Sequence, residues 1–137
     1  MTVRIGLIGA GRMGETLAYH LAFGMETADF VAVADPNPER AQKVARRFGV
    51  ADSYTHYEEL LARDDLQAVV VVTSTNAHVE VIQAAAAAGK HIFTEKPLAL
   101  TLEGCDQAIA AVEAAGVKLQ VGFMRRFDPA YLAAKEK

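Results

Sequence analysis

The chain has 137 residues, a length that suits one domain with its own hydrophobic core. Hydrophobic residues make up 52% of it and charged residues 23%, which is ordinary for a globular protein, and the net charge is −3. Without a basic stripe or a long apolar run, neither nucleic acid nor a membrane is expected as a partner. Met1 leads almost directly into the first predicted strand, and Cys105 is the single cysteine. The sequence therefore predicts a cytoplasmic protein with neither a signal peptide nor an internal disulfide.

The first predicted strand, Val3–Ile8, runs into a glycine-rich turn of the pattern G-x-G-x-x-G. In such a turn the first glycine permits a sharp bend, the second lets a pyrophosphate approach the backbone, and the third lets the following helix pack tightly. The unpaired N–H groups and the dipole of that helix favour an anion. Arg12 is placed to shield the phosphate charge. The predicted cofactor-binding residues of the turn are Gly9, Ala10, Gly11, Arg12, Met13 and Gly14.

A second predicted strand, Asp29–Asp35, ends in an acid about 20 residues beyond the turn. The Asp35 carboxylate can accept hydrogen bonds from both hydroxyls of an adenosine ribose, and it would repel a 2′-phosphate. The pattern therefore favours NAD over NADP, although Arg40 lies near enough to soften that preference. The alternative is an ordinary glycine turn followed by a solvated aspartate.

Strand and helix signals alternate along the rest of the chain. Further strands are predicted at Asp52–Tyr54, Ala68–Thr73, His91–Thr94 and Lys118–Phe123. Solidly apolar strands are typical of a parallel sheet covered on both faces. The predicted fold is α/β, a doubly wound Rossmann sheet of strand order 3-2-1-4-5-6. Residues 1–125 would form the dinucleotide-binding domain, and residues 126–137 would begin a connection to a further domain.

The helices carry end signals and apolar faces. Asn37 and Pro38 predict the start of one helix and Gly49 its end, while Thr55 with Glu58 predicts a capping box for the next. The apolar face of the last long helix is predicted to consist of Leu102, Cys105, Ile109 and Val112.

In this topology the carboxyl ends of all strands meet at one edge, where ligands bind. After the fourth, fifth and sixth strands come polar groups that would face the nicotinamide end of a dinucleotide. They are Thr73, Ser74, Thr75, Asn76 and His78, then Glu95, Lys96 and Pro97, then Arg125. Plainer roles remain open: a helix cap for Asn76, packing for His78 and a surface ion pair for Arg125. The remaining histidines have no ligand spacing, so no metal site is predicted.

Four stretches, GLIGAGRMG, AVADPNPERA, AGKHIFTEKPLALT and GFMRRFDPAY, resemble the N-terminal half of the glucose–fructose oxidoreductase / inositol dehydrogenase / rhizopine catabolism (Gfo/Idh/MocA) family. The last stretch is especially similar to the inositol dehydrogenases of that family. The resemblance implies an NAD-dependent dehydrogenase acting on a polyol or sugar. It implies that Lys96 of the E-K-P motif is catalytic and reaches the oxygen at the reacting carbon. It also makes the Lys96–Pro97 peptide a candidate for the cis form.

The same resemblance implies parts beyond this chain. Family members have a second α/β domain that supplies an aspartate, an acid/base histidine and the usual contacts of a homo-oligomer. We therefore expect this chain alone to bind NAD, to turn over little polyol, and to expose an apolar surface near its fifth and sixth strands. Two alternatives stay open: a dehydrogenase for another sugar or amino-sugar derivative, and a non-catalytic NAD(P)-binding regulator. A regulator would not need the lysine of E-K-P.

Overall fold

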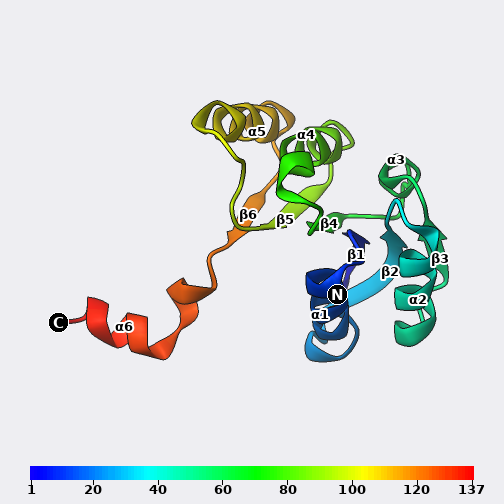
Figure 1. Ribbon diagram of the computed structural model, residues 1–137, viewed down its shortest axis with the longest axis horizontal. Coiled ribbons are helices and arrows are strands. Elements are labelled where there is room, and N and C mark those ends of the chain that lie inside the picture. The colour runs from blue at the N-terminus through cyan, green and yellow to red at the C-terminus, as the bar shows by residue number, and fades with distance from the viewer.

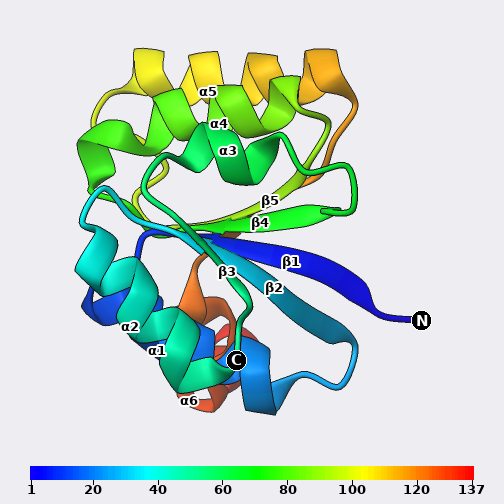
Figure 2. The same cartoon turned by 90° about the vertical axis from the view of Figure 1, so that its right-hand side faces the viewer.

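The computed structural model describes residues 1–137 and contains one six-stranded, all-parallel sheet with helices on both faces (Figures 1 and 2). The strands are β1 (Val3–Ile8), β2 (Ala28–Ala34), β3 (Asp52–Tyr54), β4 (Ala68–Val71), β5 (His91–Glu95) and β6 (Leu119–Gly122). Their spatial order is β3-β2-β1-β4-β5-β6, which confirms the predicted Rossmann topology.

The helices fall into two layers. They are α1 (Arg12–Tyr19), α2 (Pro38–Phe48), α3 (Tyr57–Leu61), α4 (His78–Ala87), α5 (Leu102–Ala115) and α6 (Pro129–Lys135), with short turns η1 (His20–Gly24), η2 (Thr75–Ala77) and η3 (Met124–Phe127). Figure 2 shows α3, α4 and α5 on one face of the sheet and α1 and α2 on the other. No helix combines the length and the apolar character that crossing a bilayer requires.

Each face of the sheet has its own hydrophobic core, because alternate residues of a strand point to opposite faces. On β4, Val69 and Val71 belong to the cluster under α3, α4 and α5, whereas Val70 belongs to the cluster under α1 and α2. The solidly apolar strand predicted from the sequence is therefore buried on both sides.

The ends of α2 form as predicted. The Asn37 side chain accepts hydrogen bonds from the backbone N–H groups of Glu39 and Arg40, and Gly49 ends the helix in the left-handed conformation with φ 70°. Similarly, the Thr101 side chain accepts from the N–H of Gly104 at the start of α5.

Two of the differences from the predicted elements lie at the carboxyl edge of the sheet. Strand β4 ends at Val71 rather than Thr73, because the Thr73 carbonyl turns away to the ring of His78. The capping box of Thr55 is wrong: α3 begins at Tyr57, with His56 as an N-cap that makes no side-chain bond. The Tyr54 carbonyl still accepts from Asp35 N at 3.1 Å, so the chain is held at the sheet edge until that point.

The predicted apolar face of α5 is also only partly right. Its buried residues are Gly104, Ala108 and Val112, whereas Leu102 is 85% exposed and Ile109 is 42% exposed. Cys105 is half-buried. The helix packs through its small residues, and two of its large apolar residues face outward.

The chain beyond β6 leaves the sheet. In Figure 1, η3 and α6 extend away from the other elements, and every residue of α6 is exposed. Four large apolar side chains, Met124, Phe127, Tyr131 and Leu132, are about half or more exposed on this segment.

Candidate functional site

The three glycines of the turn after β1 serve different purposes. Gly9 has φ 107°, and a Cβ there would lie 2.5 Å from the carbonyl oxygen of Val72. A Cβ on Gly14 would collide with the carbonyl oxygen of Gly9, so α1 can pack against the turn only because that atom is missing. At Gly11 a Cβ would meet no protein atom within 4 Å. The fold explains Gly9 and Gly14, whereas Gly11 faces open space at the start of α1.

This open space lies in front of the N-terminus of α1. The first amides of a helix have no partner inside it, and they carry the positive end of its dipole. The first intrahelical bond here runs from Glu15 N to Gly11 O at 2.9 Å. The amides before Glu15 thus face the space that the missing Gly11 side chain leaves, which suits a phosphate.

Asp35 follows the last residue of β2 and is only 7% exposed. Its Oδ2 accepts a hydrogen bond from Ala10 N, and its Oδ1 accepts one from Asn37 N, both at 2.8 Å. A carboxylate oxygen has a second lone pair, so each oxygen can still accept from a ligand hydroxyl. The carboxylate is therefore held beside the glycine turn with acceptor capacity to spare.

A crevice of about 510 Å³ joins these features at the carboxyl edge of the sheet. Eight residues predicted from the sequence line it: Gly9, Gly11, Arg12, Met13, Asp35, Arg40, Thr73 and Ser74. It lies where the chain leaves β1, β2 and β4, the point at which the strand order reverses. Dinucleotides bind at this point in doubly wound sheets.

Sequence reasoning missed several lining residues, of which Tyr57 is the most distinctive. Its hydroxyl donates a hydrogen bond to Glu80 Oε1 at 2.7 Å. Partial burial, together with that bond, raises the pKa of Tyr57 well above its ordinary value, so the ring stays neutral. Tyr57 follows the carboxyl end of the short strand β3, and that position was the available signal. The other missed lining residues include Pro36, Asn37, Thr55, Val72 and Ala77.

The remaining predicted residues lie outside the crevice lining. Thr75 and Asn76 line a separate cavity of about 320 Å³ beside the start of α5. His78 is 2% exposed, with its ring nitrogens against two backbone carbonyls. The Arg125 guanidinium contacts the hydroxyl and stacks on the ring of Tyr131 within the C-terminal segment.

The E-K-P motif follows β5. The Lys96–Pro97 peptide is cis, as predicted. Glu95 Oε2 accepts a hydrogen bond from Lys96 N at 3.3 Å, and the Lys96 side chain is exposed with no ion pair. Its ammonium group is therefore available to a ligand at the same edge of the sheet. No cluster of three or more His, Cys, Asp or Glu side chains suitable for a metal ion is present.

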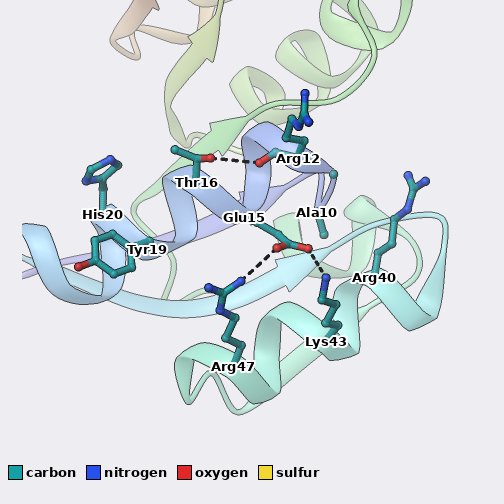
Figure 3. Close-up of a pocket in the computed structure, with 10 residues that line it drawn as sticks. Ala10, Arg12, Glu15, Thr16, Tyr19, His20, Arg40, Lys43 and Arg47 are labelled. Carbon is teal, nitrogen blue, oxygen red and sulfur yellow. Dashed lines mark hydrogen bonds and ion pairs between the residues drawn. The ribbon is translucent and has the colours of Figure 1, made fainter.

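A basic cleft of about 720 Å³ adjoins the crevice between α1 and α2 (Figure 3). Glu15 pairs with Lys43 at 2.7 Å and with Arg47 at 3.2 Å. The hydrogen bond from Lys43 is the main cause that lowers the pKa of Glu15. Figure 3 shows the guanidinium groups of Arg12 and Arg40 pointing away from Glu15. Gly11 and these two arginines line both cavities, so positive charge gathers at the mouth of the crevice and attracts anions.

The residues 3–123 match the model of the GFO_IDH_MocA family, described as an oxidoreductase family with an NAD-binding Rossmann fold. The chain is 47% identical over 135 residues to an inositol 2-dehydrogenase of Acidothermus cellulolyticus and 44% identical to a scyllo-inositol 2-dehydrogenase (NAD(+)) of Bacillus subtilis. Each comparison covers 98% of this chain.

A solved structure gives the same picture. The scyllo-inositol dehydrogenase of Lactobacillus casei with bound NAD(H) and scyllo-inositol superposes with a TM-score of 0.93 at 31% identity, over 99% of this chain. This chain spans about 40% of the length of that structure and of the two curated relatives.

Proposed function

The chain belongs to the Gfo/Idh/MocA oxidoreductase family with an NAD-binding Rossmann fold, and from this premise we propose that it is the cofactor-binding part of an inositol-type polyol dehydrogenase. The reaction would move a hydride from a ring carbon that bears a hydroxyl to the nicotinamide. The names of the relatives support the substrate class, since they include inositol 2-dehydrogenases and a scyllo-inositol 2-dehydrogenase.

The observation that carries the proposal is the junction between the glycine turn and Asp35. Open space at Gly11 suits a diphosphate, and the carboxylate of Asp35 lies at hydrogen-bonding distance from Ala10 N in that same turn. An adenosine ribose bound here would place its hydroxyls on Asp35 when the diphosphate lies on the start of α1. The residues present therefore fit NAD.

Asp35 tests this binding mode directly. Replacing Asp35 by Ser removes two charge-assisted hydrogen bonds to the ribose, so we expect the dissociation constant for NADH to rise about 10- to 100-fold and NADPH to be relatively favoured. Isothermal titration calorimetry with both nucleotides measures the change.

Asp106→Ser is the matched control, because Asp106 is an exposed acid on α5 far from the crevice in sequence and in the sheet order. Thermal unfolding of each variant checks that the turn still folds without the Asp35 bond to Ala10. Tighter NADH binding by Asp35→Ser, or no binding by the wild-type chain at millimolar nucleotide, would contradict the proposal.

In the proposed reaction, Lys96 supplies the positive charge. Bound nicotinamide would accept the hydride. The Lys96 ammonium would hold the substrate hydroxyl and stabilise the negative charge that develops on its oxygen as the hydroxyl proton passes to the acid/base histidine that the family resemblance implies in the second domain. The carbon–oxygen double bond would then form as the hydride leaves the ring carbon. Its exposure and its freedom from any ion pair support this role.

A fusion tests the role of Lys96, because this chain spans about 40% of its relatives. Residues 1–137 would replace the corresponding part of the scyllo-inositol 2-dehydrogenase of Bacillus subtilis. We expect the fusion to reduce NAD with an inositol, and Lys96→Ala to lower kcat by about 100-fold or more with little change in NADH affinity. Lys118→Ala, an exposed lysine at the opposite end of the sheet, should leave kcat unchanged.

The same fusion separates the remaining candidates. Activity on an aldose or amino sugar in place of inositol would indicate another dehydrogenase specificity. A folded fusion that binds NADH, yields no turnover on any of these substrates and is indifferent to Lys96→Ala would support a non-catalytic NAD(P)-binding regulator.

We also expect the protein to work as a homo-oligomer in the cytoplasm. The exposed apolar side chains Phe127, Tyr131 and Leu132 support an association surface beyond β6. Sedimentation velocity of the fusion described above, at several concentrations, would detect the homo-oligomer, and a monomeric fusion at all of them would contradict it.

A further inference from the structure

His78 opens α4 and is almost completely buried, at 2% exposure. Its Nδ1 lies 2.9 Å from the carbonyl oxygen of Pro97, and its Nε2 lies 3.2 Å from the carbonyl oxygen of Thr73. Both ring nitrogens therefore face acceptors. A neutral imidazole has one N–H and serves one of these carbonyls, whereas an imidazolium serves both.

The two carbonyls belong to two different loops of the carboxyl edge. Thr73 lies in the loop after β4 and lines the crevice. Pro97 follows Lys96 directly in the loop after β5. Beyond the ends of β4 and β5, no other hydrogen bond joins these loops. The His78 ring thus lies between the crevice wall and the lysine loop, within hydrogen-bonding distance of a carbonyl of each.

A histidine that only fills the core would need a hydrogen-bond partner for its single N–H group and apolar neighbours around the ring. Here the ring spans a gap between two backbone segments that each lead to a candidate functional group. Removing the ring nitrogens takes away the hydrogen-bond partner of one carbonyl when the ring is neutral, or of both when it is charged, and lets the Lys96 loop move relative to Thr73. We propose that His78 is a positioning residue, which holds Lys96 in register with the nicotinamide end of the crevice. This inference rests on the function proposed above.

The consequence is a selective effect on nucleotide binding. ADP-ribose carries the adenosine and both phosphates of the cofactor but lacks the nicotinamide. Its binding depends on the glycine turn after β1 and on Asp35 after β2, whereas the His78 bridge joins the loops that follow β4 and β5. NADH additionally reaches the loops after β4 and β5. Loss of the bridge should weaken NADH and spare ADP-ribose.

The experiment compares three variants by calorimetry with NADH and with ADP-ribose. His78→Phe keeps a ring of similar bulk and removes both nitrogens. We expect it to weaken NADH about fivefold and ADP-ribose less than about twofold. His78→Gln retains amide N–H donors and should recover part of the NADH affinity. Ile82→Ala, one turn later on α4 and fully buried, is the control for lost packing.

A second readout needs no ligand. Backbone hydrogen exchange should accelerate in residues 73–77 and 96–101 of His78→Phe, and not in these loops of Ile82→Ala, once both are compared at equal global stability. Labelling of Lys96 by an amine-reactive reagent, followed by mass spectrometry, should lose its protection by NADH in His78→Phe only.

The outcomes separate the two proposals. The positioning role of His78 is overturned if His78→Phe weakens NADH and ADP-ribose equally, or if Ile82→Ala weakens NADH selectively as well. Either result leaves the proposal that the chain binds NAD intact. If the wild-type chain binds neither nucleotide, the proposed function fails, and the exchange of the two loops still decides whether His78 holds them together. If His78→Phe does not fold, His78→Gln decides the question. The positioning role is supported if both the ratio of NADH affinity to ADP-ribose affinity and the hydrogen exchange of the two loops equal those of the wild type. It is overturned if the affinity ratio changes while the hydrogen exchange of the loops does not.

Discussion

At the scale of single residues, the chain uses its lysines in two opposite ways. Lys96 is exposed and unpaired at the carboxyl edge of the sheet. Lys90, only six positions earlier, is 7% exposed, and its Nζ donates to the carbonyl oxygens of Arg63 at 2.6 Å and Leu66 at 3.0 Å. Lys90 thus binds two carbonyls of the loop between α3 and β4, and its role is structural.

Lys90→Met keeps the aliphatic stem of the side chain and removes its donors. Two buried carbonyls then lose their partner, and we expect the free energy of unfolding to fall by about 1–3 kcal/mol. Urea unfolding measures the change. Lys118→Met, at an exposed position, should stay within about 0.5 kcal/mol of wild type. Equal effects of the two substitutions would show that the Lys90 bonds contribute nothing.

The residue scale was also where the sequence was most informative about the site. Glycine spacing and an acid at a strand end indicate Gly11 and Asp35, because each role depends on backbone geometry that the pattern itself dictates. Sequence reasoning missed Tyr57, since its position after a strand of only three residues is a weaker signal than glycine spacing. Sequence reasoning also missed the bridge formed by His78, because the bridge depends on two carbonyls that only the folded chain brings together.

At the scale of elements, the bounds of β1 and β3 agree with the prediction. The N-cap of α3 lies one residue later than predicted, and β4 ends two residues earlier than predicted. The buried face of α5 was also predicted only in part. Hydrophobic spacing identifies large apolar side chains, but close packing of two helices favours small ones. Ala108 is fully buried in the same cluster as Ala85 and Ala86 of α4, while Leu102 faces solvent.

This packing can be tested on α5 itself. Ala108→Leu forces extra volume between α4 and α5, and we expect it to lower the free energy of unfolding by about 1–3 kcal/mol. Leu102→Ser removes a large apolar side chain from an exposed position, and it should lower the free energy of unfolding by no more than about 0.5 kcal/mol. Chemical denaturation would refute the assignment of the helix face if the two effects were reversed.

At the scale of the whole molecule, ion pairs link elements that are distant in sequence. Glu15 joins α1 to Lys43 and Arg47 of α2, and Arg63 joins Asp52 of β3 to Asp65 before β4. The hydrogen bond from Lys43 lowers the pKa of Glu15 below 4.5, and that from Arg63 lowers the pKa of Asp65 below 3.8. Each carboxyl thus binds fewer protons in the folded chain than in the unfolded chain.

The stability that these carboxylates contribute is therefore present above their ordinary pKa values and is lost as the pH falls through the lowered, folded-state values. We expect Tm to fall on acidification below about pH 5, and Glu15→Gln to be less stable than wild type near neutral pH. The difference between them should shrink towards zero in acid. Melting curves across pH measure it, with Glu113→Gln as an exposed control; a difference independent of pH would rule out the ion pairs as its source.

The carboxylate of Asp35 is already anchored by one peptide group at the end of each of two neighbouring strands. A nucleotide arriving from solution consequently meets acceptors that need no rotation to receive it, so little conformational entropy is surrendered on docking. Recognition of the sugar should then be nearly rigid.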